Sequence, residues 1–260
     1  MMVVKERTQR AEGVVLRHSN FGEADRLLVL FTREMGKVRA IAKGVRKPRS
    51  RKGGHLEPFT RVNLLLAKGR HLSIITQAEA LNIYYPLYED LELFGHASYI
   101  IELIDRFTLE GEANPALYAL LIETLERLND GENPFLVVRY YELRMLDFVG
   151  FRPELFECVS CKAKIEPEDQ FFSYEMGGVL CPQCAPQHDS MRPVSLNALR
   201  FLRHYQRSSY TQARRAKVND LIRMEMETLM QAYVAYLLER SLNSPAFLRR
   251  LRREDAKPER

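Results

Sequence analysis

The first eighty residues contain five short runs rich in β-branched and aliphatic residues, and this arrangement limits the fold more than any other feature of the chain. Turn signals such as Met35-Gly36 and Lys68-Gly69-Arg70 separate neighbouring runs. The third run alternates basic with apolar residues, as a half-buried strand does. Five short strands in such a length predict a small barrel, for which the five-stranded OB type is the natural candidate. The predicted strands cover residues 12–20, 26–32, 37–43, 61–67 and 72–78.

The apolar pattern changes from strand to helix at about residue 88. Leu91, Phe94 and Ile101 begin a series of apolar residues that recur at helical spacing. Ser195 is a plausible N-cap and Gly150 a usual stop signal. The predicted helices cover residues 88–107, 114–128, 134–148, 195–207 and 217–242.

These two patterns predict an α+β protein with a barrel followed by helices. We expect an OB-fold nucleic-acid-binding domain over residues 1–82 and the first part of a helical domain over residues 83–152. A four-cysteine module follows over residues 153–190, inserted into the helical domain. The second part of the helical domain then covers residues 191–260 and ends in a basic tail.

Four cysteines, the only ones in the chain, form two Cys-x-x-Cys pairs with nineteen residues between them. This spacing is typical of a tetrahedral Cys₄ zinc site, in which each pair curls as a knuckle and the insert returns the chain as a hairpin. Four thiolates leave no open coordination position, so we expect a structural Zn²⁺. Four reduced, buried thiols or a redox dithiol are the alternatives. The predicted ligands are Cys158, Cys161, Cys181 and Cys184.

Positive charge is concentrated in residues 37–56, which carry eight Lys or Arg and no Asp or Glu, whereas the whole chain is only +5. Such a local excess attracts polyanions. We therefore predict a DNA-binding surface in which the strand residues line the barrel and the loop residues form a mobile flap. A solvated loop, or one that binds an acidic protein, is the alternative. The predicted residues are Lys37, Arg39, Lys43, Arg46, Lys47, Arg49, Arg51 and Lys52.

Aromatic rings that could stack on bases are few in the first eighty residues. Phe31 alternates with core residues and is expected to be buried, whereas Phe21, beside Gly22 in a turn, is the better stacking candidate. With so few rings, binding should depend on phosphates and be nearly independent of sequence. Further basic residues could contact DNA or an acidic peptide: Arg200, Arg203, Arg207, Arg214, Arg215 and Lys217 on the later helices, and Arg249, Arg250, Arg252 and Arg253 in the tail.

Several function classes lack support in the sequence. The chain has no phosphate-binding Gly-x-x-x-x-Gly-Lys motif, no Gly-x-Gly-x-x-Gly and no His-Glu-x-x-His, so we expect a protein that is not an enzyme. No apolar run is long enough for a membrane span, and the charged N-terminus lacks the apolar core of a signal peptide. The expected location is cytoplasmic, in association with the nucleoid.

Segments along almost the whole chain resemble the bacterial RecO family of recombination mediators. The likeness rests on residues 12–17 (EGVVLR), 21–37 (FGEADRLLVLFTREMGK), 42–46 (AKGVR) and 56–59 (LEPF), and continues with residues 140–146 (YYELRML), 150–153 (GFRP) and the two cysteine pairs. The order and spacing of these segments carry the resemblance, because no single one of them is decisive.

The resemblance implies an OB-fold, a helical domain and a zinc module. It also implies binding of single- and double-stranded DNA and annealing of complementary strands without ATP. The implied partners are RecR, sometimes RecF, the acidic tail of single-strand-binding protein and, indirectly, RecA, which is loaded onto the coated strand. Basic barrel residues contact DNA in this family, so Lys37, Arg39, Lys43 and Arg46 are implied candidates with the loop arginines.

Two other classes of function stay open on the residues alone. One is an RNA-binding or ribosome-assembly OB-fold protein with a structural zinc. The other is an enzyme with a structural zinc and a basic substrate cleft, which the missing cofactor motifs disfavour.

Overall fold

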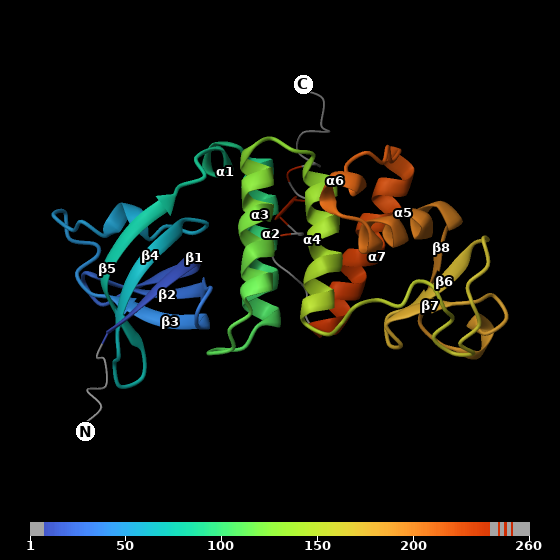
Figure 1. Ribbon diagram of the computed structural model, residues 1–260, viewed down its shortest axis with the longest axis horizontal. Helices are drawn as coiled ribbons and strands as arrows, with labels where there is room; N and C mark the ends of the chain where they lie inside the picture. The colour runs from blue at the N-terminus through green and yellow to red at the C-terminus, as the bar shows by residue number, and fades with distance from the viewer. Residues whose placement is uncertain (1–7, 240–243, 245–246, 249–250, 252–260) are drawn as a thin grey trace. The chain divides into compact units, whose positions relative to one another are not determined.

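Five strands close into a barrel in the order β1-β2-β3-β5-β4, which confirms the predicted OB-type barrel (Figure 1). They are β1 (Thr8–Phe21), β2 (Asp25–Thr32), β3 (Gly36–Ala42), β4 (Arg61–Ala67) and β5 (Ser73–Asn82). All neighbours are antiparallel except β3 and β5, which pair in parallel through Ala40–Ser73 and Ile41–Ile74. The computed structural model of the chain describes residues 8–239, 244, 247, 248 and 251.

Strand β1 joins both neighbours because it is long and bends. It pairs with β4 along its first half and with β2 along its second, with a register shift between Val15 and Arg17. A bulge of this kind bends a strand and increases its twist, which helps a short sheet to close. Gly13 lies at the crossing, where a Cβ atom would come within 3.0 Å of the Thr32 side chain and 3.1 Å of the Phe31 carbonyl oxygen.

The first of two units, Met1–Asp130, contains the barrel and the helices α1 (Pro86–Glu89), α2 (Leu91–Phe107) and α3 (Pro115–Asn129). The predicted boundary at residue 82 falls inside this unit, between the barrel and its helices, and stays a prediction. Barrel and helices share ion pairs and aromatic contacts. Arg17 Nε lies 2.7 Å from Asp105 Oδ2 of α2, and Arg61 pairs with both Glu12 and Glu126 of α3.

The second unit, Gly131–Arg260, combines helices with a small sheet. It contains α4 (Pro134–Phe148), α5 (Leu196–Arg207), α6 (Tyr210–Ala213) and α7 (Asp220–Leu237). Its three-stranded sheet has the order β7-β6-β8, from β7 (Gly178–Leu180), β6 (Gln170–Ser173) and β8 (Met191–Val194). Single-turn helices cover Gly53–His55 in the first unit and Ala185–Gln187 in the second.

Most predicted helices are confirmed, and their ends follow ordinary capping chemistry. The side chains of Asp90, Asn114, Asn133, Ser195 and Asn219 accept hydrogen bonds from the first turns of α2, α3, α4, α5 and α7. The predicted hairpin around residues 171–180 is β6 and β7, whereas the sequence did not predict β8 or α6. The predicted end of the last helix at residue 242 and the four arginines of the tail lie outside the described residues.

Within the described part of the chain, none of the helices combines the length and the apolar character needed to cross a bilayer.

Candidate metal centre and nucleic-acid interface

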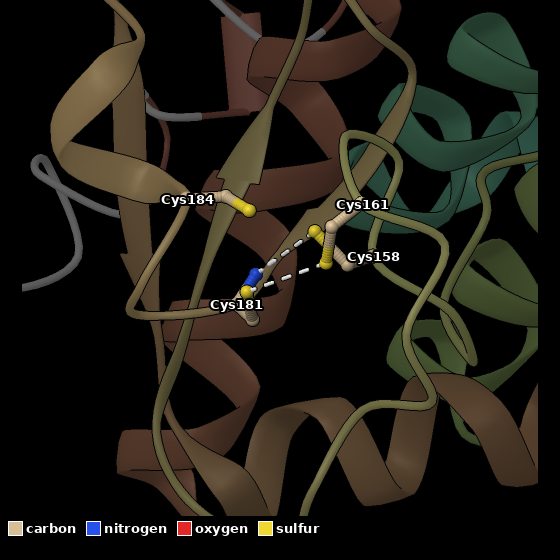
Figure 2. Close-up of side chains that lie close together, drawn as sticks. All are labelled: Cys158, Cys161, Cys181 and Cys184. Atoms are coloured by element: carbon tan, nitrogen blue, oxygen red, sulfur yellow. Dashed lines mark hydrogen bonds between the residues drawn. The ribbon is translucent and has the colours of Figure 1, made fainter.

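The four cysteines converge from two loops of the second unit, as Figure 2 shows. Their sulfur atoms all lie within 4.8 Å of one another, and the Sγ atoms of Cys161 and Cys181 are 3.9 Å apart. Tetrahedral ligation at a metal–sulfur distance of about 2.3 Å would place sulfurs about 3.8 Å apart. The four side chains can therefore hold one metal ion.

The backbone shapes each pair as a knuckle. Cys158 N–H donates to the Ala163 carbonyl at 2.8 Å, and Lys162 N–H donates to the Cys158 carbonyl at 2.9 Å while Lys162 adopts a φ of 63°. In the second knuckle the N–H groups of Cys184 and Ala185 both donate to the Cys181 carbonyl. These turns bring the two sulfurs of each pair to the same side of the chain.

Backbone donors favour a thiolate at the buried position. Burial raises the pKa of the Cys158 thiol, but hydrogen bonds from the backbone N–H groups of Cys181, Cys161 and Ser160 outweigh it and lower that pKa to about 6. The sulfurs of Cys181 and Cys161 act in the opposite sense on Cys184, whose pKa they raise. A divalent cation would supply the positive charge that four crowded sulfurs favour.

The module that carries the cysteines packs on the helices of the same unit. Phe172 of β6 meets Tyr233 of α7 edge to face, with ring centroids 5.2 Å apart, and the Tyr233 hydroxyl donates to the Phe151 carbonyl at 3.1 Å. Gly178 admits no side chain, because a Cβ atom would lie 2.6 Å from both the Glu154 carbonyl oxygen and Val159 Cγ1. The metal site therefore lies beside a packed core rather than on a free loop.

The predicted DNA-binding residues of the first unit divide into two groups. Lys37 and Arg39 on β3 already face carboxylates: Lys37 Nζ lies 3.5 Å from Asp105 Oδ1 and donates to the backbone carbonyl of the same residue, and Arg39 Nε lies 3.6 Å from Glu110 Oε1. Only 14% of the Lys37 side chain is exposed. A phosphate would have to compete with Asp105 and Glu110 for these two cations.

The loop after β3 presents the other predicted residues. Lys43, Arg46, Lys47, Arg49 and Arg51 are exposed. Lys52 differs from them, because its ammonium donates to the carbonyls of Lys43 and Ile75 at 3.3 and 3.1 Å and so ties the loop to the barrel.

The backbone of this loop follows consecutive turns. Lys47 N–H donates to the Gly44 carbonyl, and Ser50 N–H donates to the Lys47 carbonyl. Arg46 N–H reaches the Ala24 carbonyl at 2.9 Å in the neighbouring turn between β1 and β2. These turns place the exposed cations on one continuous loop. The mobility of this loop stays a prediction.

Among the rings of the first eighty residues, one is available for stacking. Phe21 is 51% exposed at the end of β1, whereas Phe31 is fully buried as predicted. Phe59 is also buried, with a φ of 68°, and its ring meets Phe94 of α2 edge to face at 5.3 Å. The role of Phe21 in base stacking stays a prediction.

A carboxylate fixes the end of the basic loop. Glu57 accepts from Arg26 Nη1 at 2.7 Å and lies 2.9 Å from His18 Nε2. Burial raises the pKa of Glu57, but the hydrogen bonds and charges of Arg26 and His18 outweigh it and lower the pKa below 4.5.

Glu57→Gln is therefore expected to lower Tm at neutral pH and to have no effect at low pH. The pKa of Glu57 is lower in the folded protein than in the unfolded chain, where it is near 4.5. The ionised carboxylate therefore stabilises the fold above pH 4.5, and this stabilisation is lost as the pH falls through the pKa of the folded state. Because the Glu57 side chain is 40% exposed, we expect at most about 1 kcal/mol, or about 2–4 °C. Thermal melts of both proteins from pH 3 to pH 7 measure it. Glu23→Gln, an exposed change in the neighbouring turn, is the control, and a difference that does not vary with pH would refute the role of the carboxylate.

The fold and the sites define a chain with an OB-type barrel, an exposed basic loop, a helical unit and a Cys₄ centre. The model of the family "Recombination protein O N terminal" matches residues 6–84, and that of "Recombination protein O C terminal" matches residues 88–246. This chain therefore belongs to the recombination protein O (RecO) family.

Curated relatives agree over nearly the full length of the chain. The DNA repair protein RecO of Roseiflexus sp. (strain RS-1) is 40% identical over 245 residues, which are 94% of this chain and 86% of that protein. The protein of the same name from Dehalococcoides mccartyi (strain CBDB1) is 35% identical over 95% of this chain and 97% of its own length. The protein of this name from Desulforudis audaxviator (strain MP104C) is 38% identical over 93% of this chain and 96% of its own length.

Proposed function

We propose that this protein acts in DNA repair and homologous recombination by binding single- and double-stranded DNA and annealing complementary strands without ATP. The observation that carries the proposal is the exposed basic loop on an OB-type barrel, in a chain of the RecO family. RecR, and in some settings RecF, would act with it to load RecA onto strands coated by single-strand-binding protein, whose acidic tail is a further proposed partner.

The proposed mechanism is charge screening. Two complementary strands repel each other, and a cationic surface that neutralises phosphates lowers the barrier to their encounter without bond chemistry. Lys47, Arg49 and Arg51 suit this task because each is exposed. With Phe21 as the only exposed ring of the barrel's phenylalanines, contacts to phosphates should dominate and sequence preference should be weak.

The metal is proposed to be zinc in a structural role. Thiolate ligands in a tetrahedral set are typical of Zn²⁺, and four protein ligands leave no position for a substrate. Cys158, Cys161, Cys181 and Cys184 would hold it, and the ion would join the two knuckles of the module.

Competition between labelled DNA and RNA strands of the same sequence tests the proposed substrate. We expect single-stranded DNA to be bound tightly at low salt and to be displaced by unlabelled DNA at least as well as by RNA. If RNA displaced the DNA at much lower concentration than DNA itself, the proposal would fail in favour of an RNA-binding OB-fold protein.

A further inference from the structure

A hollow of about 750 Å³ lies in the second unit, between helix α5 and the hairpin of the first cysteine pair. Arg200, Arg203 and Arg207 follow one another at intervals of three and four residues, so they share one face of α5. Seven residues of helix correspond to about 10 Å along the axis. The residues that line the hollow are Phe156, Glu157, Lys164, Ile165, Arg200, Arg203, His204, Arg207 and Ser208.

The charges around this hollow are unbalanced. Four of the residues that line the hollow are Lys or Arg, and Glu157 is the one acidic residue of the lining. Within the described part of the chain, none of the four cations forms an ion pair with a carboxylate. This distinguishes the hollow from the face of β3, where Lys37 and Arg39 have acidic partners.

The arginines are held in place by the module. Arg207 stacks on the ring of Phe156, with Cζ 3.4 Å from the ring centroid, and Arg203 lies over the same ring at 5.3 Å. Arg203 Nε donates to the Leu155 carbonyl at 2.6 Å. A guanidinium stacked on a ring keeps its N–H groups available around the edge, where they can bind a phosphate in the plane.

One donor of Arg203 faces this hollow without a partner. Its Nη2 atom is buried and has no hydrogen-bond partner among the described residues. Burial lowers the pKa of Arg203 and the neighbouring charge of Arg207 lowers it further, while the negative charge of Glu154 acts in the opposite sense. A buried cationic donor without a partner is destabilising, and an anionic ligand in the hollow would relieve it.

The ligand chemistry that fits is a chain of regularly spaced phosphates. The cations form a line about 10 Å long, which suits a repeating anion better than one terminal carboxylate. The two apolar side chains of the lining are partly covered, because Arg207 stacks on the ring of Phe156 and Ile165 is only 6% exposed. The line of cations, rather than an apolar pocket, is therefore the feature that selects the ligand.

We propose that this hollow is a second nucleic-acid site, in which Arg200, Arg203, Arg207 and Lys164 hold the phosphodiester backbone of one strand while the loop of the barrel holds another. The inference rests on the proposed function of the barrel. It adds to that function a way for a single chain to screen two strands at once.

The number of strands bound per chain tests this inference. The full-length protein is titrated with non-complementary oligothymidylate of about 12 nucleotides, within the range of site sizes of OB-folds. Calorimetry and native mass spectrometry give the stoichiometry per chain. We expect two oligonucleotides on the unaltered chain, and one on Arg200→Gln/Arg207→Gln, with the remaining affinity unchanged within about twofold.

Matched variants separate this site from the barrel. Lys68→Gln/Arg70→Gln removes the same charge from exposed residues outside the hollow and should still bind two strands. Lys47→Gln/Arg49→Gln/Arg51→Gln should lose the barrel site and keep the one on α5. Because Arg207 packs on Phe156, its replacement could disturb the fold, so Arg200→Gln is also tested alone. This single variant should keep the native Tm and make the slope of log K against log salt at the second site shallower by about 0.7.

Other outcomes overturn the inference. The unaltered chain could bind only one oligonucleotide and lose it in Lys47→Gln/Arg49→Gln/Arg51→Gln. That result would leave the proposed function intact and refute the second site. Binding of two by a natively folded Arg200→Gln/Arg207→Gln would do the same. A short oligoglutamate peptide that binds this hollow and is not displaced by oligothymidylate would make it a peptide site. No DNA binding at all would refute the barrel proposal as well.

Discussion

Replacing Cys158 with serine is expected to release the metal and to unfold the module of residues 153–190. Cys158 is fully buried and its sulfur accepts a hydrogen bond from Cys181 N–H at 3.4 Å, so the side chain joins the two knuckles. A hydroxyl is a poor ligand beside three thiolates, and zinc-finger peptides gain about 10–16 kcal/mol from structural zinc. The packing of Phe172 on Tyr233 should retain part of the structure. We therefore expect a fall in Tm of at least about 10 °C.

The measurements are the zinc content of the purified protein and its thermal melt. Ser160→Ala is the matched control, because it changes the same knuckle but keeps all four thiolates. The Ser160 hydroxyl lies 3.3 Å from His188 Nε2 and also forms a hydrogen bond with Cys184. One zinc per chain and an unchanged Tm in Cys158→Ser would show that the four cysteines are not a structural metal site.

Neutralising the basic loop is expected to remove most of the affinity of the barrel site for single-stranded DNA. In Lys47→Gln/Arg49→Gln/Arg51→Gln three exposed cations are lost, so the slope of log K against log salt should become shallower by about 2.1, at 0.7 per phosphate contact. If both proteins bind equally at 1 M salt, the loss at 50 mM salt is on the order of 500-fold. The loss should be equal for oligothymidylate and oligoadenylate, because phosphate contacts carry no sequence information.

Fluorescence anisotropy over a salt series measures both quantities. Arg33→Gln/Lys68→Gln/Arg70→Gln is the matched control, since it removes the same charge from exposed positions of the first unit outside the loop. A loss that depended on the base, or an equal loss in the control, would contradict the assignment of the loop.

Local patterns of the sequence predicted the parts of the fold that depend on near neighbours. Alternation in residues 37–43 identified β3, and the spacing of the cysteine pairs identified the four residues that converge. Strand β8 escaped prediction because it has four residues and includes Pro193, which gives neither length nor alternation. Helix α6 is equally short and lies between two longer helices.

The remaining features depend on contacts between distant residues. Lys37 belongs to a basic run, yet its partner Asp105 is 68 residues further on, so no local pattern could reveal the ion pair between them. The same long-range contacts join α2 and α3 to the barrel and explain the unit boundary at residue 130. The arginines of α5 were visible in the sequence, but Phe156 and Lys164 come from the cysteine module, and only the fold brings them beside α5.

Annealing of two complementary, fluorescently labelled DNA strands, without ATP and across a salt series, tests the central claim most directly. Annealing that is much faster with the protein, that weakens steeply as salt rises and that is lost in Lys47→Gln/Arg49→Gln/Arg51→Gln is the predicted result. Tight DNA binding with no acceleration of annealing at any salt concentration would contradict the account and leave a binding protein that does not bring strands together.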